Sequence, residues 1–285
     1  MNGASAPTTT NKVSTPGATL ALYRLMLRTV VTRSRVLSIL GLGLLGVIVG
    51  AAIGHVHPSP PVAVPVGPGV PPTIGGPVGQ APIILRTAPP ISSELHRAAQ
   101  FIHAFGLSLL VPVATLVFAS AALGDPSEDG TLVYLWLRPV ARWRIIVAGA
   151  AASFTVTWPI VTVPLALAAA LAGHDGALVT GTIAAVTVII AGYVGLFLAL
   201  GLRVKRALVW GLLYIFIWEG FVATANVTAA RLAVRTYGRS VLEQISHAHL
   251  KPTDISSPWS WIVPPLVGLV ALVYACRRLS RQDVT

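Results

Sequence analysis

The chain has 285 residues, of which 54% are hydrophobic and only 10% are charged, and its mean hydropathy is +0.77. Soluble domains carry about 25% charged residues, so this composition excludes an ordinary soluble globular protein and predicts an integral membrane protein. The formal net charge is +11, but no Lys/Arg block is long enough to form a nucleic-acid patch, so we expect no nucleic-acid partner. The single cysteine, Cys276, excludes an intrachain disulfide.

The N-terminal residues 1–17 are polar, without apolar periodicity, and predict a disordered cytoplasmic tail. The next segment, 18–35, combines basic and apolar residues at helical spacing. The basic residues are Arg24, Arg28 and Arg35, and the apolar ones are Leu20, Tyr23, Leu27 and Val30. This pattern is typical of an interfacial amphipathic helix on an anionic leaflet, and the alternative is the ordinary basic flank of a membrane span.

Six apolar segments are each long enough to cross a hydrocarbon core of about 30 Å. They predict an all-α polytopic membrane protein with six transmembrane helices in a domain covering 36–276. The predicted spans are 36–54, 96–123, 145–171, 178–202, 207–225 and 259–276. In the first span, Gly46, Gly50 and Gly54 recur at every fourth position and leave a smooth face for close helix packing. We expect this face to pack inside the molecule, with a dimer contact as the alternative.

The loops between the spans differ strongly in charge. The first, 55–94, holds eleven of the 22 prolines and cannot build a core. If the N-terminus is cytoplasmic, the segments on that side hold 14 of the 20 Lys and Arg residues. The excess of basic residues on the cytoplasmic side therefore predicts a cell-membrane protein with both termini inside, including the tail 277–285.

The predicted external segment 226–258 carries Arg231, Arg235 and Arg239 on one helical face. Apolar residues available for the other face are Leu232, Val241, Leu242 and Ile245. We expect an amphipathic or re-entrant helix in the outer leaflet, whose arginines reach the lipid headgroups.

The loop 124–144 is a charged island between two apolar segments, so it must lie in water. Asp125-Pro126-Ser127-Glu128 has the form of a helix start, in which Asp125 caps the backbone and Glu128 occupies the capping-box position. We expect a short helix there that contacts a soluble partner. The candidate contact residues are Asp125, Glu128, Asp129, Gly130, Thr131 and Leu132. The alternative is a solvated loop that only joins two spans.

An acid followed by Gly130-Thr131-Leu132, an apolar-aromatic run, Arg138-Pro139-Val140, a small residue and Arg142 resembles the cytoplasmic loop of ABC-2 type transporter permeases. In that family, the loop after the second span carries a coupling helix that docks on a separate ATP-binding subunit. The sequence departs from the family pattern at Ala148-Gly149-Ala150, a region where a lysine is often seen.

The resemblance implies an ABC-2/ABCG-like exporter fold with an N-terminal amphipathic helix. It also implies a partnership with two ATPase subunits and with a second copy of this chain or a related permease. The chain itself would carry no cofactor and would not be an enzyme, because ATP and Mg would be bound by the partner ATPase. No G-x-x-x-x-G-K-[ST] phosphate-binding loop occurs in the sequence.

Glu219 is the one acid placed well inside a predicted span, where an ionisable group costs at least about 2.5 kcal/mol unless it is paired, protonated or near water. It could bind a cation or line a substrate path, or it could make a structural hydrogen bond between two helices. The first role supports a rival function, an ion-coupled carrier that titrates at Glu219. A second rival is a non-transporting membrane assembly protein.

Two histidine pairs, His55 with His57 and His247 with His249, fall on the predicted external side. Imidazole pairs can bind zinc or copper. Neither pair has supporting cysteine or carboxylate ligands at a suitable spacing, so we expect no metal site.

Overall fold

The computed structural model describes residues 15–55, 93–128, 141–248, 250, 255 and 257–281. Within these ranges every regular element is helical. Six helical segments are long and apolar enough to cross a membrane: Arg33–His55, Glu94–Asp125, Trp143–Gly173, Gly176–Arg203, Ala207–Ala225 and Ser257–Leu279. The predicted all-α architecture with six candidate spans is therefore confirmed, as expected where backbone polar groups must be satisfied within each helix.

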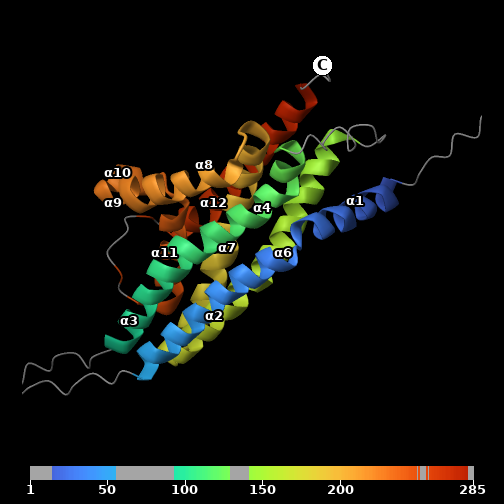
Figure 1. Cartoon of the computed structure of the whole chain (residues 1–285). Coiled ribbons are helices and arrows are strands. Elements are labelled where there is room, and N and C mark those ends of the chain that lie inside the picture. The colour runs from blue at the N-terminus through green and yellow to red at the C-terminus, as the bar shows by residue number, and fades with distance from the viewer. Residues whose placement is uncertain are drawn as a thin grey trace, which may run out of the picture.

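The described helices follow one another with short connections or with segments outside the described residues (Figure 1). They are α1 (Thr15–Val30), α2 (Arg33–His55), α3 (Ser93–Phe101), η1 (Ile102–Leu110), α4 (Val111–Glu128), α6 (Arg142–Gly173), α7 (Gly176–Arg203), α8 (Ala207–Leu213), η2 (Tyr214–Val222), α9 (Ala223–Ala225), α10 (Val227–Ala230), α11 (Val234–Ser246) and α12 (Ser257–Arg281). The elements η1 and η2 are π-helices, which in proteins frequently mark functional sites. The second and fifth spans are thus each interrupted by π-helical hydrogen bonding.

Helix α7 is the central helix of the bundle and packs against α4, α6, α11 and α12. Its Tyr193 and Phe197 are fully buried and stack on each other with ring centroids 5.2 Å apart. Small residues bring α12 unusually close, because a Cβ on Gly195 would collide with the carbonyl oxygen of Gly268. The contact between α7 and α12 is therefore a backbone contact that depends on glycine.

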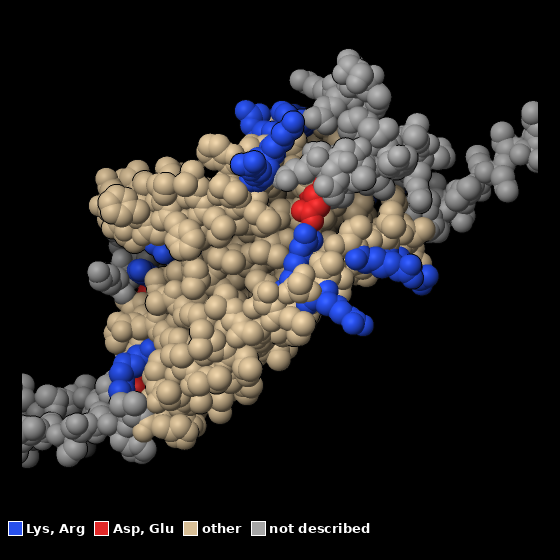
Figure 2. All heavy atoms as spheres, viewed as in Figure 1, with Lys and Arg blue, Asp and Glu red and all other residues tan. Residues whose placement is uncertain are grey.

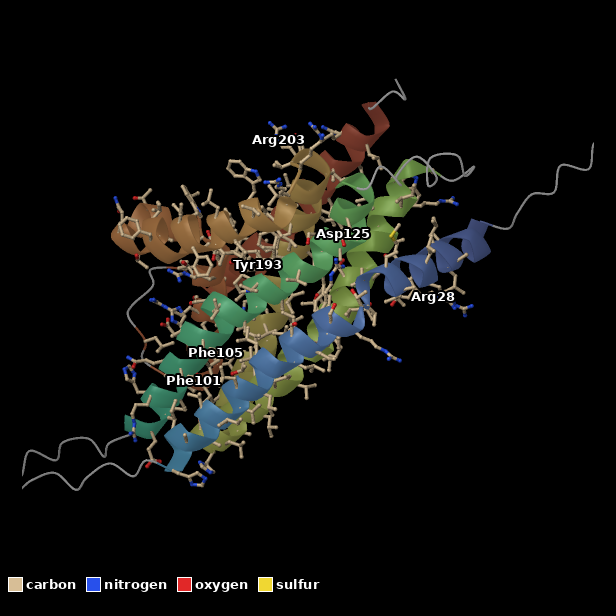
Figure 3. The ribbon with its side chains drawn as sticks, in the orientation of Figure 1. Arg28, Phe101, Phe105, Asp125, Tyr193 and Arg203 are labelled. Carbon is tan, nitrogen blue, oxygen red and sulfur yellow. The ribbon has the colours of Figure 1, made fainter. Side chains whose placement is uncertain are left out.

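The three spaced glycines of α2 lie on the face that meets η1 and α6. A Cβ at Gly46 would lie 2.5 Å from the ring of Phe105, and one at Gly50 would lie 3.0 Å from Ala168. A Cβ at Gly54 would collide with the carbonyl oxygen of Leu171. Figure 3 shows Phe105 between η1 and α2, next to Phe101, on which it stacks. The glycine face thus packs within this chain.

The segment 18–35 contains two helices instead of one. Helix α1 ends at Val30, and α2 begins at Arg33, so the end of the predicted amphipathic helix belongs to the first span. Helix α1 packs against α6 and α4 and buries Leu22, Met26 and Val30. Arg24 and Arg28 are exposed, and Figure 3 shows Arg28 pointing away from the bundle. Of the predicted apolar face, Val30 is buried and Tyr23 and Leu27 pack partly against the core, whereas Leu20 is exposed.

Basic residues gather at one end of the bundle. Helix α1, the end of α4, the start of α6, the turn between α7 and α8 and the end of α12 all lie at this end (Figure 1). Figure 2 shows most blue spheres there, above a broad uncharged band, with smaller charged groups beyond it. A charge distribution of this kind is the topology signal that the sequence predicts.

Candidate functional site

The predicted coupling residues are only partly described. The structure describes Asp125 and the backbone of Glu128, whereas Asp129, Gly130, Thr131 and Leu132 lie outside the described residues. The predicted helix start at Asp125 is wrong, because α4 continues through Glu128. A capping signature is local, and it does not reveal that the preceding residues are already helical. Asp125 therefore lies in the last turn of α4.

Asp125 forms an ion pair with Arg35 in the first turn of α2. The positive end of a helix dipole is its N-terminus and the negative end its C-terminus, so each of these charges lies at the helix end that disfavours it. The ion pair offsets both unfavourable placements. The side chains are 27% and 38% exposed, so the pair lies at the edge of the bundle, and Figure 3 shows Asp125 where α4 approaches the start of α2.

The end of α4 also meets α7 and α8. A cavity of about 210 Å³ lies beside Asp125 and is lined by the end of α4, by Arg206 and by the first residues of α8. Gly124 faces Gly201 of α7, where a Cβ on Gly201 would lie 3.2 Å from the Cα of Gly124. The second, fourth and fifth spans are therefore joined to a third neighbour, α2, at the end of α4, where the segment predicted to couple begins.

Glu219 is buried in η2, with 1% of its surface exposed. Its carboxylate accepts a hydrogen bond from the hydroxyl of Tyr193 on α7. It also accepts from the hydroxyl of Tyr214, at 3.1 Å, and from the backbone N–H of Val234, at 3.3 Å. Three donors on three elements thus converge on one carboxylate.

The bond to Val234 has a specific structural role. Val234 is the first residue of α11, and the preceding N-cap residue, Ala233, has no side chain that can accept from the free N–H groups. Glu219 supplies the missing acceptor from another helix, at the end where a helix dipole favours negative charge. Arg235 lies within electrostatic range of the same carboxylate. These contacts match the structural role that the sequence leaves open for Glu219.

The segment 226–258 folds differently from the predicted single amphipathic helix. Arg231 lies in the turn between α10 and α11, whereas Arg235 and Arg239 lie on α11. The three arginines therefore do not share one helical face, and that prediction is wrong. Helix α11 packs against α7 and α12, with Val241 and Leu242 fully buried.

A polar network fixes α11 to the start of α12. The amide nitrogen of Gln244 donates to the hydroxyls of Ser240, at 3.0 Å, and Ser260, at 2.9 Å. The hydroxyl of Ser257 donates to the carbonyl oxygen of the same amide, at 3.0 Å. Because all three contacts come from one side chain, Gln244 is the hub of this helix junction.

The histidine candidates are dispersed in the structure. His55 ends α2 and His247 follows α11 in a left-handed conformation, and both are exposed. His57 and His249 lie outside the described residues. Among the described residues, no group of three or more potential metal ligands lies together.

Sequence reasoning did not single out Tyr193, Tyr214 or Gln244, and it assigned Arg35 to a lipid headgroup surface. One signal was present for the tyrosines, because a tyrosine inside an apolar helix needs a hydrogen-bond partner for its hydroxyl when it is buried. Their shared partner depends on how three helices pack, which local sequence does not encode.

No family model matches the chain, and no curated protein matches its sequence.

Proposed function

We propose that the chain is the membrane-spanning permease subunit of an ATP-driven ABC exporter. A separate ATPase subunit would hydrolyse ATP, and this chain would translocate the substrate. The proposal is supported by the six candidate spans and by the pattern from Asp129 to Arg142 that resembles an ABC-2 coupling loop. The observation that carries it is the ion pair between Arg35 and Asp125, which ties two spans together directly before that pattern.

A coupling role requires that a push on the loop 124–144 reaches the centre of the bundle. The last turn of α4 meets α7 through the close approach of Gly124 and Gly201. In turn, α7 packs against α6, α11 and α12. Because α4 and α7 touch backbone to backbone at this point, the two helices would move as rigid bodies. A displacement of α4 would therefore shift α7 and the helices packed against it.

The proposed complex contains two permeases and two ATPase subunits, with ATP and Mg bound by the ATPases. The second permease is another copy of this chain or a related chain, and alternating access would occur between them. In the cell membrane, both termini and the loop 124–144 would face the cytoplasm, as the basic end of the bundle favours (Figure 2). The chain would be a non-catalytic subunit.

Co-purification tests the proposal. The tagged chain is isolated from its native membrane in mild detergent, and mass spectrometry searches for an ATPase with a Walker-type phosphate loop. A variant with Glu128→Lys and Asp129→Lys reverses the two acids of the loop, and Glu94→Lys, at the opposite end of the same span, is the matched control.

We expect a stoichiometric ATPase with the parent chain and the control, and its loss with the double variant. Absence of any ATPase from a correctly folded parent chain would overturn the proposal.

An ion-coupled carrier is the second candidate, because Glu219 is a buried carboxylate within a candidate span. Its three hydrogen bonds account for its burial without a transported ion. The two functions separate in a transport assay of Glu219→Gln. Loss of gradient-driven transport with unchanged folding stability would favour the carrier, and lowered stability with retained transport would favour the anchoring role.

A further inference from the structure

A cavity of about 570 Å³ opens between the α3–η1 junction, the end of the fifth span and α11. Its polar lining contains three arginines, Arg231, Arg235 and Arg239, together with neutral polar residues such as Gln100 and Asn226. No carboxylate is found among the lining residues in the described ranges. The cavity is therefore a positively charged chamber within an otherwise apolar bundle.

The nearby acids balance the charge of these arginines only in part. Glu243 forms an ion pair with Arg239, at 3.3 Å, one turn further along α11. Glu219 lies within electrostatic range of Arg235, but the two side chains form no ion pair. Among the acids that the structure describes, none forms an ion pair with Arg231 or Arg235.

Two guanidinium groups that face one cavity repel each other, and a half-buried guanidinium also loses part of its hydration. A bound anion would compensate both costs. The planar fork of donors on arginine matches the oxygens of a phosphate group bidentately. Arg231 lies in an exposed turn and Arg235 is half-buried on α11. The two side chains can thus approach a bound anion from the mouth and from the wall of the cavity.

The remaining surface favours an anion that carries an apolar body. Val227 lines the cavity and is 62% exposed. The apolar side chains of Leu250 and Ile255 also line the cavity. A free inorganic anion would gain nothing from these side chains, whereas an acyl chain could lie across them.

We propose that this cavity binds the phosphate of an anionic amphiphile, with Arg231 and Arg235 as its principal ligands. The bound group is a phosphate whose negative charge is not compensated within the ligand, and it belongs to a lipid headgroup. This site stands on the cavity itself and requires neither an ATPase partner nor transport.

Binding to the purified full chain tests this site. The chain is delipidated in detergent, and native mass spectrometry titrates dioleoylphosphatidic acid, dioleoylphosphatidylcholine or inorganic phosphate. The main variant is Arg231→Gln, since an exposed turn residue tolerates the change, and Arg235→Lys keeps the charge of the second ligand but removes its fork. Lys205→Gln, in the exposed turn between α7 and α8, removes the same charge at the other end of the bundle.

We expect phosphatidic acid to bind more tightly than phosphatidylcholine, and Arg231→Gln to weaken its binding by roughly tenfold, the usual loss for one charge-assisted hydrogen bond. Lys205→Gln should leave the binding unchanged. Equal binding of inorganic phosphate, lost in the same variants, would support the phosphate site and assign a free anion as its source. Equal affinity for the two lipids, or equal losses in Arg231→Gln and Lys205→Gln, would overturn the proposal.

Discussion

Arg35 and Asp125 lie 90 positions apart in sequence and form an ion pair that joins the start of α2 to the end of α4. Each charge stands at the helix end whose dipole disfavours it, so neither position is explained by its own helix. The pair is explained by the packing of the two spans against each other at the basic end of the bundle. It ties the end of α4 to α2 at Asp125, the first of the predicted coupling residues.

The first prediction concerns this joint. Asp125→Asn should lower the free energy of unfolding by about 0.5–1 kcal/mol, the value of a partly exposed ion pair. Adding Arg35→Gln should cost little more, because the interaction is already lost. The measurement is unfolding in mixed micelles, with Arg33→Gln as the control, since Arg33 forms no ion pair with a described acid. Fully additive losses in the double variant would contradict the pairing.

Glu219 should act mainly as an anchor. Glu219→Ala leaves the buried hydroxyl of Tyr193 and the N–H of Val234 without their acceptor, so we expect a loss of about 2–5 kcal/mol in unfolding free energy. Glu219→Gln should lose about 1–2 kcal/mol, because the amide oxygen can still accept. Thermal unfolding of the detergent-solubilised chain measures both.

Tyr274→Phe is the matched control for this anchor. Its hydroxyl accepts from Arg203 at an exposed position, so its removal should be nearly neutral. The anchoring role is wrong if Glu219→Ala is as stable as the parent chain.

Two glycine substitutions should differ sharply in effect. In Gly195→Ala the new methyl group meets the backbone of α12 at Gly268, and we expect a destabilisation of about 1–3 kcal/mol from overpacking. In Gly41→Ala nothing lies within 4 Å of the new atom, and the better helix propensity of alanine should make the change neutral or slightly stabilising. The unfolding midpoints of the two variants measure this difference. Equal shifts of the two midpoints from that of the parent chain would show that α7 and α12 do not approach so closely.

The junction of α11 and α12 should loosen when its hub is removed. Gln244→Ala deletes three hydrogen bonds, and we expect faster amide hydrogen exchange in α11 together with a loss of about 1–2 kcal/mol. Thr180→Ala is the control, since the Thr180 hydroxyl bonds only to carbonyls of its own helix. If exchange in α11 is the same in both variants, Gln244 does not hold the junction.

The six candidate spans could be predicted because span length and hydropathy are local properties of the sequence. Helix ends could not be predicted as well. Hydropathy falls at Asp125, but the backbone hydrogen bonding of α4 continues through Glu128. The break between α1 and α2 was also not predicted, because basic residues at helical spacing continue across it.

The candidate sites depend on contacts between distant residues, and these were beyond sequence reasoning. Glu219 was identified as an unusual buried acid, but its partners Tyr193 and Val234 lie 26 and 15 positions away. Similarly, Arg231 and Arg235 were placed on one helix by their spacing. The turn after α10 separates them, and the surrounding helices turn them toward a shared cavity.

Site-specific crosslinking from the loop 124–144 tests the central claim most directly. A photo-reactive amino acid at Leu132 should form an adduct with a Walker-type ATPase in native membranes, because Leu132 belongs to the predicted coupling contact. The same group at Glu94, an exposed position at the opposite end of the span, should form none. An ATPase adduct from Leu132 alone is the predicted result. No adduct at Leu132, or equal adducts at both positions, would contradict the assignment of this chain as an ABC permease subunit.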